Sequence, residues 1–230
     1  MRFWLSHVVY PLLVFFILLI LLNITDSDVT ISDLFFNHAL NKWYYGERWW
    51  TVTLIHIWGK NMIAAIFIAA LLALGLSFFV QRMKKYRFIF VYIVLTILLA
   101  TGIVALLKEY SNIDCPWDLS LFNGTRPYYN IFSDKPDNLA VGKCFPGGHS
   151  SGGFSLLFLY FLFLDYKKSY AYTGLFIGLT IGTIFGYGQL VRGAHFVSHD
   201  MTSAMICWLV ALFLYKLFVH SRMKRFRNTG

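Results

Sequence analysis

Apolar residues occur in six blocks along the chain, and each block is long enough, or nearly so, to cross a bilayer as a helix, which takes about 20 residues. The blocks are continuous, whereas the strands of a membrane β-barrel would alternate apolar and polar residues. We therefore predict an all-α integral membrane protein with six transmembrane helices. The expected spans are Val8–Ile24, Met62–Val80, Phe88–Leu107, Ser151–Leu164, Tyr172–Leu190 and Met201–Val219.

The first block has the apolar character of a secretory signal peptide. The residues at its end, Asn23-Ile24-Thr25-Asp26, lack the small-x-small pattern of a cleavage site, so we expect a retained first helix. No internal repeat or low-complexity tract divides the sequence, and residues 1–230 are expected to form a single domain.

Composition agrees with this interpretation. The 230 residues are 58% hydrophobic and 13% charged, and the mean hydropathy is +0.60. A soluble domain is about 45–50% apolar and about 25% charged. These values exclude disordered, collagen-like and disulfide-scaffold classes, and they argue against a soluble globular protein.

Basic residues are concentrated on one side of the predicted membrane topology. The N-terminus, 81–87, 165–171 and the C-terminal tail hold 12 of the 20 basic residues and one of the 11 acidic residues, a net charge of 12 − 1 = +11. The other side has 8 − 10 = −2. The positive-inside rule makes the first side, with both termini, cytoplasmic. The overall charge of +9 is thus a topology signal and does not predict nucleic-acid binding. The tail Arg222–Arg227 is expected to anchor this orientation.

Three loops are expected on the outer side, at residues 25–61, 108–150 and 191–200. The first contains a cluster of five aromatic residues between positions 43 and 50, and aromatic residues concentrate at membrane interfaces. We expect a short amphipathic interfacial helix within it. The cluster consists of Trp43, Tyr44, Tyr45, Trp49 and Trp50.

Polar residues gather at the outer ends of spans three to six. Ionisable residues at membrane depth are costly and usually functional. Arginine and lysine suit a phosphate dianion, glycines let backbone N–H groups approach it, and two imidazoles can act as nucleophile and acid. The sequence therefore predicts a phosphate-handling site. Its members are Lys108, Arg126, Gly147, Gly148, His149, Arg192, His195, His199 and Asp200.

Spacing places Arg192, His195 and His199 at i, i+3 and i+7, on one face of a helical turn. A nucleophilic histidine needs a partner that fixes its ring by binding the far ring nitrogen. Either His199 or Asp200 is a candidate to orient His195 in this way.

At these residues the chain resembles the type 2 phosphatidic acid phosphatase family, which has six-helix membrane members and the motifs K-x6-R-P, P-S-G-H and S-R-x5-H-x3-D. The corresponding segments are Lys108-x6-Cys115-Pro116, Pro146-Gly147-Gly148-His149 and Arg192-Gly-Ala-His195-x3-His199-Asp200. The resemblance implies metal-independent hydrolysis, without a cofactor, of a phosphomonoester or a pyrophosphate.

The same resemblance assigns roles to individual residues. His195 is the implied nucleophile, which forms a phosphohistidine, and His149 is the implied general acid and then general base. Lys108, Arg126 and Arg192 would stabilise charge on the phosphoryl oxygens.

The chain departs from the family pattern at four positions. Cys115 stands where the first arginine is expected, and we expect Arg126 to replace its charge. Gly147 replaces the serine, which leaves a backbone N–H as donor. Gln189 replaces the arginine six residues before His195, and Arg192 is the expected substitute. The fourth departure is His199, where an aspartate is expected, with Asp200 next to it.

Cys115 and Cys144 lie on the predicted outer side and flank the first two motifs. Because an oxidising periplasm permits disulfides, we expect a bond between them. Cys207 lies in the sixth span and is expected to be a packing residue.

The favoured function is a lipid phosphatase at the periplasmic face of a bacterial inner membrane, with the bilayer and a lipid phosphate as its partners. Undecaprenyl pyrophosphate, lipid A phosphates and phosphatidylglycerol phosphate stay open as substrates. The alternatives are a lipid phosphoryl transferase, a transporter or scaffold, and a metallo-hydrolase. The last would use the ligands His149, His195, His199 and Asp200, although the sequence lacks a His-Glu-x-x-His motif.

Overall fold

The computed structural model describes residues 1–220 and residue 222, and of the predicted basic tail only Arg222 lies within them. The regular elements of the described chain are helices, apart from the antiparallel hairpin β1 (Phe36–Asn37) and β2 (Lys42–Trp43), and a long irregular segment covers residues 123–147. The helical elements are α1 (Arg2–Trp4), η1 (Leu5–Val9), α2 (Tyr10–Ile24), α3 (Ser27–Asp33), η2 (Trp50–Trp58), α4 (Gly59–Phe79), α5 (Gln81–Lys84), α6 (Arg87–Tyr110), η3 (Pro116–Asp118), η4 (Ser120–Phe122), α7 (Gly148–Phe154), η5 (Ser155–Leu157), α8 (Phe158–Leu164), α9 (Lys168–Leu190), α10 (Val197–Leu214) and η6 (Tyr215–Val219).

Several of these elements join end to end into longer helices. Five helices of the described chain are long and apolar enough to span a membrane, which supports a multi-pass membrane protein. They are Arg2–Ile24, Trp50–Phe79, Arg87–Tyr110, Lys168–Leu190 and Val197–Val219. The predicted fourth span lies in a shorter apolar helix, Gly148–Leu164. At about 1.5 Å per residue this helix falls several ångströms short of a hydrocarbon core about 30 Å thick.

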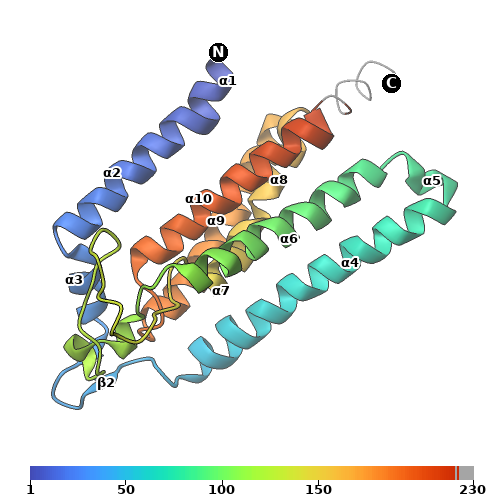
Figure 1. Ribbon diagram of the computed structural model, residues 1–230. Helices are drawn as coiled ribbons and strands as arrows, with labels where there is room; N and C mark the ends of the chain where they lie inside the picture. Colours follow the sequence, from blue (N-terminus) through green and yellow to red (C-terminus); the bar gives the residue numbers. More distant parts are fainter. Residues whose placement is uncertain (221, 223–230) are drawn as a thin grey trace.

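The helices form one bundle, with the N-terminus and the end of η6 at one end and the hairpin and loops at the other (Figure 1). The main core lies between α6, α8, α9 and the α10–η6 helix. Tyr92 and Phe161 are fully buried there, and the Tyr92 hydroxyl lies 3.1 Å from the backbone carbonyl oxygen of Ala211. Every loop that was expected on the outer side is therefore at the end of the bundle opposite the N-terminus.

The short helix Gly148–Leu164 packs on α9 at very close range. Gly174, Gly178 and Gly182 recur every four residues on the contact face of α9 and are buried. A Cβ at Gly178 would lie 2.8 Å from the backbone nitrogen of Leu157, which is closer than side chains allow. This spacing of small residues lets two helix backbones approach within a membrane, and here it brings α7, with His149, deep into the bundle.

The first outer segment differs from the expectation. The second membrane helix begins at Trp50, about three turns before the predicted Met62, so residues 50–61 are helix and not loop. The aromatic residues before it lie in β2 and the following turns, and the helix of this segment is the seven-residue α3, upstream of them. A role for α3 at the bilayer interface stays a prediction.

A second, smaller core joins the outer segments. It contains Phe36, Leu119, Phe122 and Phe196, and Trp43 packs against it. The Trp43 ring also covers Gly193. Only glycine suits this position, because its φ is +75° and because a Cβ there would overlap the indole. The hairpin therefore holds the turn between α9 and α10, where Arg192 and His195 are found.

Candidate functional site

Lys108 and the start of α7 meet at the outer end of the bundle. Lys108 is in the last turn of α6, and a Cβ built on Gly148 would lie 3.6 Å from its Nζ. No ion pair of the described chain involves Lys108. The ammonium group is thus available to an anion beside Gly148 and His149.

The backbone of Gly147 was predicted to bind phosphate, but in the structure it makes hydrogen bonds within the fold. Its backbone N–H donates to the carbonyl oxygen of His199 at 3.0 Å, and its own carbonyl oxygen accepts from the Ser203 hydroxyl at 2.7 Å. The N–H expected to replace the lost serine hydroxyl is therefore engaged within the fold. Gly147 joins the start of α7 to the start of α10.

The absence of a side chain at Gly147 makes room for Asp200. A Cβ at Gly147 would overlap Oδ1 of Asp200, and a Cβ at Gly186 would lie 2.8 Å from Oδ2. The carboxylate is buried between these two glycines, and no donor of the described chain reaches Oδ1. The side chain of the family serine would occupy this space, so the glycine at position 147 and the carboxylate at position 200 depend on each other.

His195 is buried in the turn before α10 and is 4% exposed. Its Nδ1 lies 3.5 Å from the Sγ atom of Cys144. Burial lowers the pKa of His195 well below its usual value, and the neighbouring His199, Lys108 and His149, whose protonated forms would repel a second positive charge, lower it further. The fold therefore favours the neutral form of this imidazole. Because Nδ1 faces the sulfur, Nε2 is the ring nitrogen left free of this contact.

Neither predicted orienting group hydrogen-bonds to His195 among the described residues. The rings of His195 and His199 meet edge to face with their centroids 5.8 Å apart, and Nδ1 of His199 has no partner in this part of the chain. Asp200 faces the two glycines described above. The His195 ring is held instead by the disulfide sulfur and by close packing.

His149 is fixed by residues of the second long helix. Its Nε2 lies 3.1 Å from the backbone carbonyl oxygen of Ile55. A carbonyl only accepts, so Nε2 carries a proton and Nδ1 remains for exchange with a substrate. The ring is stacked between His56 and Phe185, with centroid distances of 4.6 Å and 4.7 Å.

Gln189 and Arg192, at the end of α9 and just after it, complete this side of the site. The Gln189 amide nitrogen lies 3.2 Å from Nδ1 of His56. Nε of Arg192 donates to the carbonyl oxygen of Gly46 at 3.3 Å, whereas its buried Nη1 has no partner among the described residues. Burial lowers the pKa of Arg192. An unsatisfied buried guanidinium nitrogen suits an anionic ligand.

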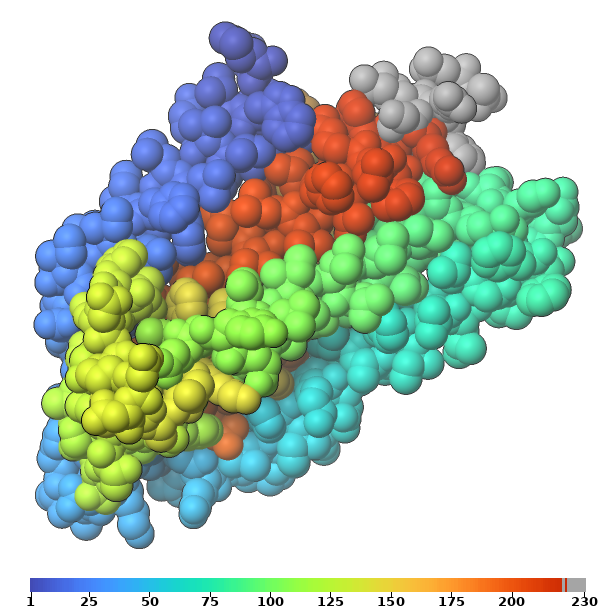
Figure 2. All heavy atoms as spheres, viewed as in Figure 1, coloured from blue at the N-terminus to red at the C-terminus, as the bar shows by residue number. Residues whose placement is uncertain are grey.

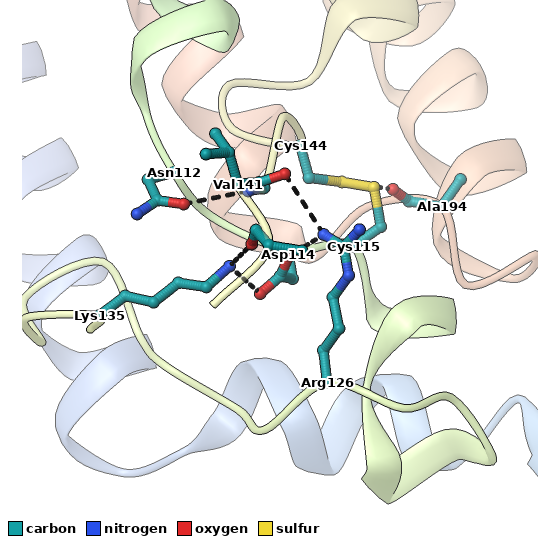
Figure 3. Close-up of polar contacts among 10 residues, drawn as sticks. Asn112, Asp114, Cys115, Arg126, Lys135, Val141, Cys144 and Ala194 are labelled. Atoms are coloured by element: carbon teal, nitrogen blue, oxygen red, sulfur yellow. Dashed lines mark hydrogen bonds and ion pairs between the residues drawn. A yellow bond between two sulfur atoms is a disulfide. The ribbon is translucent and has the colours of Figure 1, made fainter. Parts of the chain in front are cut away.

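Arg126 is not brought to this site, contrary to the expectation that it replaces the missing motif arginine. Its Nη1 pairs with Oδ1 of Asp114 and lies 3.4 Å from the carbonyl oxygen of Val141 (Figure 3). Lys135 binds the other Asp114 oxygen at 2.6 Å. The bond to Asp114 raises the pKa of Arg126. Arg126 therefore neutralises a buried carboxylate of the outer loop.

The structure joins Cys115 to Cys144, the pair proposed from the sequence (Figure 3). Their Cα atoms are 5.2 Å apart, within the usual range for a disulfide. The Cys144 sulfur also lies 3.0 Å from the carbonyl oxygen of Ala194. The bond thus ties the outer loop to the turn that carries His195. Cys207 is a free, buried cysteine in α10.

A cavity of about 510 Å³ opens beside His149 between α4 and α6. Its polar end has His56, Lys60, Lys108, Gly148 and His149. The rest of the lining is apolar, with Thr101 the single hydroxyl. Phe185 stacks on His149, and the others lie further along α4, α6 and α7; they are Ile63, Ala64, Phe67, Ile97, Leu98, Thr101 and Gly152. Helices α4 and α6 run side by side on the face shown in Figure 2. A cavity of this size and polarity suits a molecule with an anionic head and an apolar tail.

The ligands of the metallo-hydrolase alternative are not gathered in one place. Among the described residues, the metal-competent cluster consists of Cys144, His195 and His199, whose donor atoms lie within 4.8 Å of one another. The Cys144 sulfur is bonded to Cys115 and offers no thiolate. His149 and Asp200 are not members of this cluster. The donor set therefore does not fit the metal site considered from the sequence.

Ile55, His56 and Lys60 were not predicted, because this stretch was assigned to a loop. A signal was present: His56 and Lys60 stand four residues apart before an apolar run, so they share a helix face. Gln189 was noted only as a departure from the motif, and its bond to His56 depends on how two distant helices pack.

The family model of the PAP2 superfamily matches residues 89–223, which is more than half of the chain. Lys108, His149, His195 and Asp200 lie inside the match, whereas the helix with His56 lies outside it. Comparisons with curated proteins and with solved structures gave no match. Members of the matched superfamily are phosphatases that act on phosphate esters, often those of lipids. The family resemblance of the motifs is thus confirmed, and the chain belongs to the PAP2 superfamily.

Proposed function

We propose that the protein hydrolyses the phosphate monoester or diphosphate of a membrane lipid, through a phosphohistidine on His195. The observation that carries this proposal is the cavity between α4 and α6, which changes from cationic to apolar along its length. Lysine and imidazole groups at one end suit a phosphate. The apolar residues at the other end suit an acyl or prenyl chain.

In the first step Nε2 of His195 attacks phosphorus, and the bond from phosphorus to the leaving oxygen breaks. The lowered pKa of His195 favours this step, because only a neutral imidazole has a free electron pair. His149 gives its Nδ1 proton to the leaving oxygen and keeps its Nε2 proton on the Ile55 carbonyl. Lys108 and Arg192 stabilise the phosphoryl oxygens.

In the second step water replaces the histidine. Neutral His149 takes a proton from the water at Nδ1, the new oxygen bonds to phosphorus, and the bond to His195 breaks. Inorganic phosphate leaves, and His195 returns to its neutral form. This scheme needs no metal ion.

The orientation follows from charge. The basic loops predict cytoplasmic termini, so the site at the opposite end of the bundle would face the periplasm of a bacterial inner membrane. Undecaprenyl pyrophosphate, lipid A phosphates and phosphatidylglycerol phosphate are all compatible with this location.

Free phosphate should be followed after the purified protein is offered a panel of these lipid phosphates in detergent with EDTA. Release without an added acceptor supports a hydrolase and argues against a transferase. Loss of activity in EDTA would contradict metal independence. A His195→Ala variant that keeps full activity would overturn the assignment of the nucleophile.

A further inference from the structure

We propose that His56 and Lys60 form a second anion-binding subsite, next to His149, which holds the leaving phosphate of a lipid diphosphate. This inference rests on the proposed function and specifies the substrate class of the same site. Both residues belong to the helix Trp50–Phe79, which lies outside the residues matched by the family model.

The position of the pair along the cavity supports this assignment. His56, Lys60, Ile63, Ala64 and Phe67 all line the cavity, and their spacing puts them on one face of the continuous helix. The two polar residues come first and the three apolar residues follow. A lipid that places its chain along Ile63 and Phe67 therefore brings the group nearest its chain against Lys60 and His56.

The orientation of the His56 ring provides a donor for an anion. The Gln189 amide nitrogen donates to Nδ1 of His56 at 3.2 Å, so the neutral ring carries its proton on Nε2. No partner for Nε2 is found among the described residues. The centroid of the His56 ring lies 4.6 Å from that of His149, so His56 is in direct contact with the proposed general acid.

Lys60 contributes the charge. It takes part in no ion pair of the described chain, and its side chain is exposed at the cavity. The cavity lining contains two lysines, Lys60 and Lys108, and no carboxylate. Lys108 lies beside Gly148 and belongs with the transferred phosphoryl group. Lys60, on the lipid side of His149, can pair with the substrate only if the leaving group itself carries a negative charge.

The chemistry of the leaving group also distinguishes a phosphate monoester from a diphosphate. A monoester releases an alcohol, which needs one proton from His149 and no counter-charge. In a diphosphate, His195 bonds to the terminal phosphorus, and the electron pair of the broken P–O bond passes to the bridging oxygen. That oxygen takes the His149 proton, and the product is a lipid monophosphate. Its remaining negative charge lies against Lys60 and the His56 N–H.

The test compares two probes with the same alcohol, farnesyl diphosphate and farnesyl monophosphate, in detergent micelles with the full chain. We expect Lys60→Met to lower kcat/KM for the diphosphate by about 10- to 100-fold, the range for loss of one charge-assisted hydrogen bond. The monophosphate value should change by less than about 3-fold, within the effect of an exposed pair. His56→Phe should show the same selectivity, and Lys60→Arg should retain most of the activity.

Lys42→Met serves as the matched control, since Lys42 is an exposed outer lysine in β2. Equal losses on both probes, or no loss on either, would overturn the subsite. Binding of a non-hydrolysable farnesyl methylenediphosphonate separates the two proposals. If the wild type hydrolyses neither probe, the proposed function fails, while diphosphonate binding that is lost in Lys60→Met still supports the subsite. Equal binding by both proteins would contradict it, and thermal unfolding checks that each variant is folded.

Discussion

The backbone carbonyl of Ile55 accepts a hydrogen bond from Nε2 of His149 at 3.1 Å. Ile55 lies in the π-helical turns of η2, a form that is frequent at functional sites. The bond joins a motif residue of the matched region to a helix outside it. It also distinguishes the two ring nitrogens of His149, because Nε2 is bound within the fold and Nδ1 is left for the proton transfer proposed above.

The two histidines should respond differently to substitution. His195→Ala should abolish turnover, because no other neutral imidazole takes its place at the phosphorus. His149→Ala should also be inactive on substrates with a poor leaving group. On a substrate with a good leaving group it should still give a burst of phosphohistidine, measured by acid-labile labelling from ³²P-substrate. Wild-type labelling of His195→Ala would contradict the assignment.

The two candidate arginines should also differ. Arg192→Ala should lower kcat/KM by about 10²–10³-fold, as for removal of a transition-state donor. Arg126→Ala should leave kcat/KM within about 3-fold and should lower the thermal stability, because Asp114 loses one of its two cations. Steady-state kinetics and melting curves of both variants check this. A large kinetic defect in Arg126→Ala with an unchanged melting temperature would show that this arginine reaches the phosphate.

Reduction of the disulfide should lower both stability and activity. The bond closes a loop between positions 29 apart, worth about 3–4 kcal/mol in the chain-entropy model. It also packs against Nδ1 of His195. Cys115→Ser should reproduce the loss, measured as melting temperature and phosphate release, and should show no further change with added reductant. Cys207→Ala keeps the disulfide and should respond to reductant as the wild type does. Unchanged activity after complete reduction would argue that the sulfur does not help to hold His195.

Restoring the family serine at position 147 should damage the fold. Gly147→Ser places a Cβ on Oδ1 of Asp200, so the melting temperature should fall by an amount equivalent to about 1–3 kcal/mol. Removing the carboxylate as well, in Gly147→Ser/Asp200→Ala, should recover much of this loss. If the double variant is no more stable than the sum of the single changes predicts, the two positions are not coupled in this way.

Acid should destabilise the protein through His195. Its pKa is lowered in the folded state, whereas in the unfolded chain it is about 6.5. Below that pH the unfolded state binds the proton first, so the free energy of unfolding falls as pH decreases from about 6.5 toward the folded-state pKa. His195→Gln should therefore lose less thermal stability than wild type between pH 7.5 and pH 5.

The sequence was sufficient to predict the helical membrane class and to bring Lys108, His149 and His195 to one end of the bundle. Five of the six predicted spans overlap long apolar helices, because about 20 apolar residues in a row leave few alternatives. Because successive spans cross the membrane in opposite directions, the number of spans before a loop gives the side on which that loop lies. No such argument predicts which helix faces pack together, and the contact of His56 with His149 depends on that packing.

Arg126 was misplaced for a related reason. The family motif has an arginine where this sequence has Cys115, and Arg126 is a nearby arginine in the sequence. Nothing in the sequence predicts that Asp114 is buried and needs a counter-charge. A buried carboxylate needs counter-charges, and Asp114 takes both Arg126 and Lys135. The replacement of the family serine by Gly147 was visible in the sequence. The contact of this position with Asp200 could be found only in the three-dimensional structure.

Asp28 of α3 is buried, and its Oδ1 accepts the backbone N–H of Ser198 at 3.0 Å, across 170 positions of sequence. Ser198 lies in the first turn of α10, directly after the turn that carries His195. A displacement of α10 along its axis by one residue, about 1.5 Å, would break this bond. Asp28 therefore opposes sliding of α10 along its axis, so the N-terminal segment helps to fix the height of His195 at the outer end of the bundle.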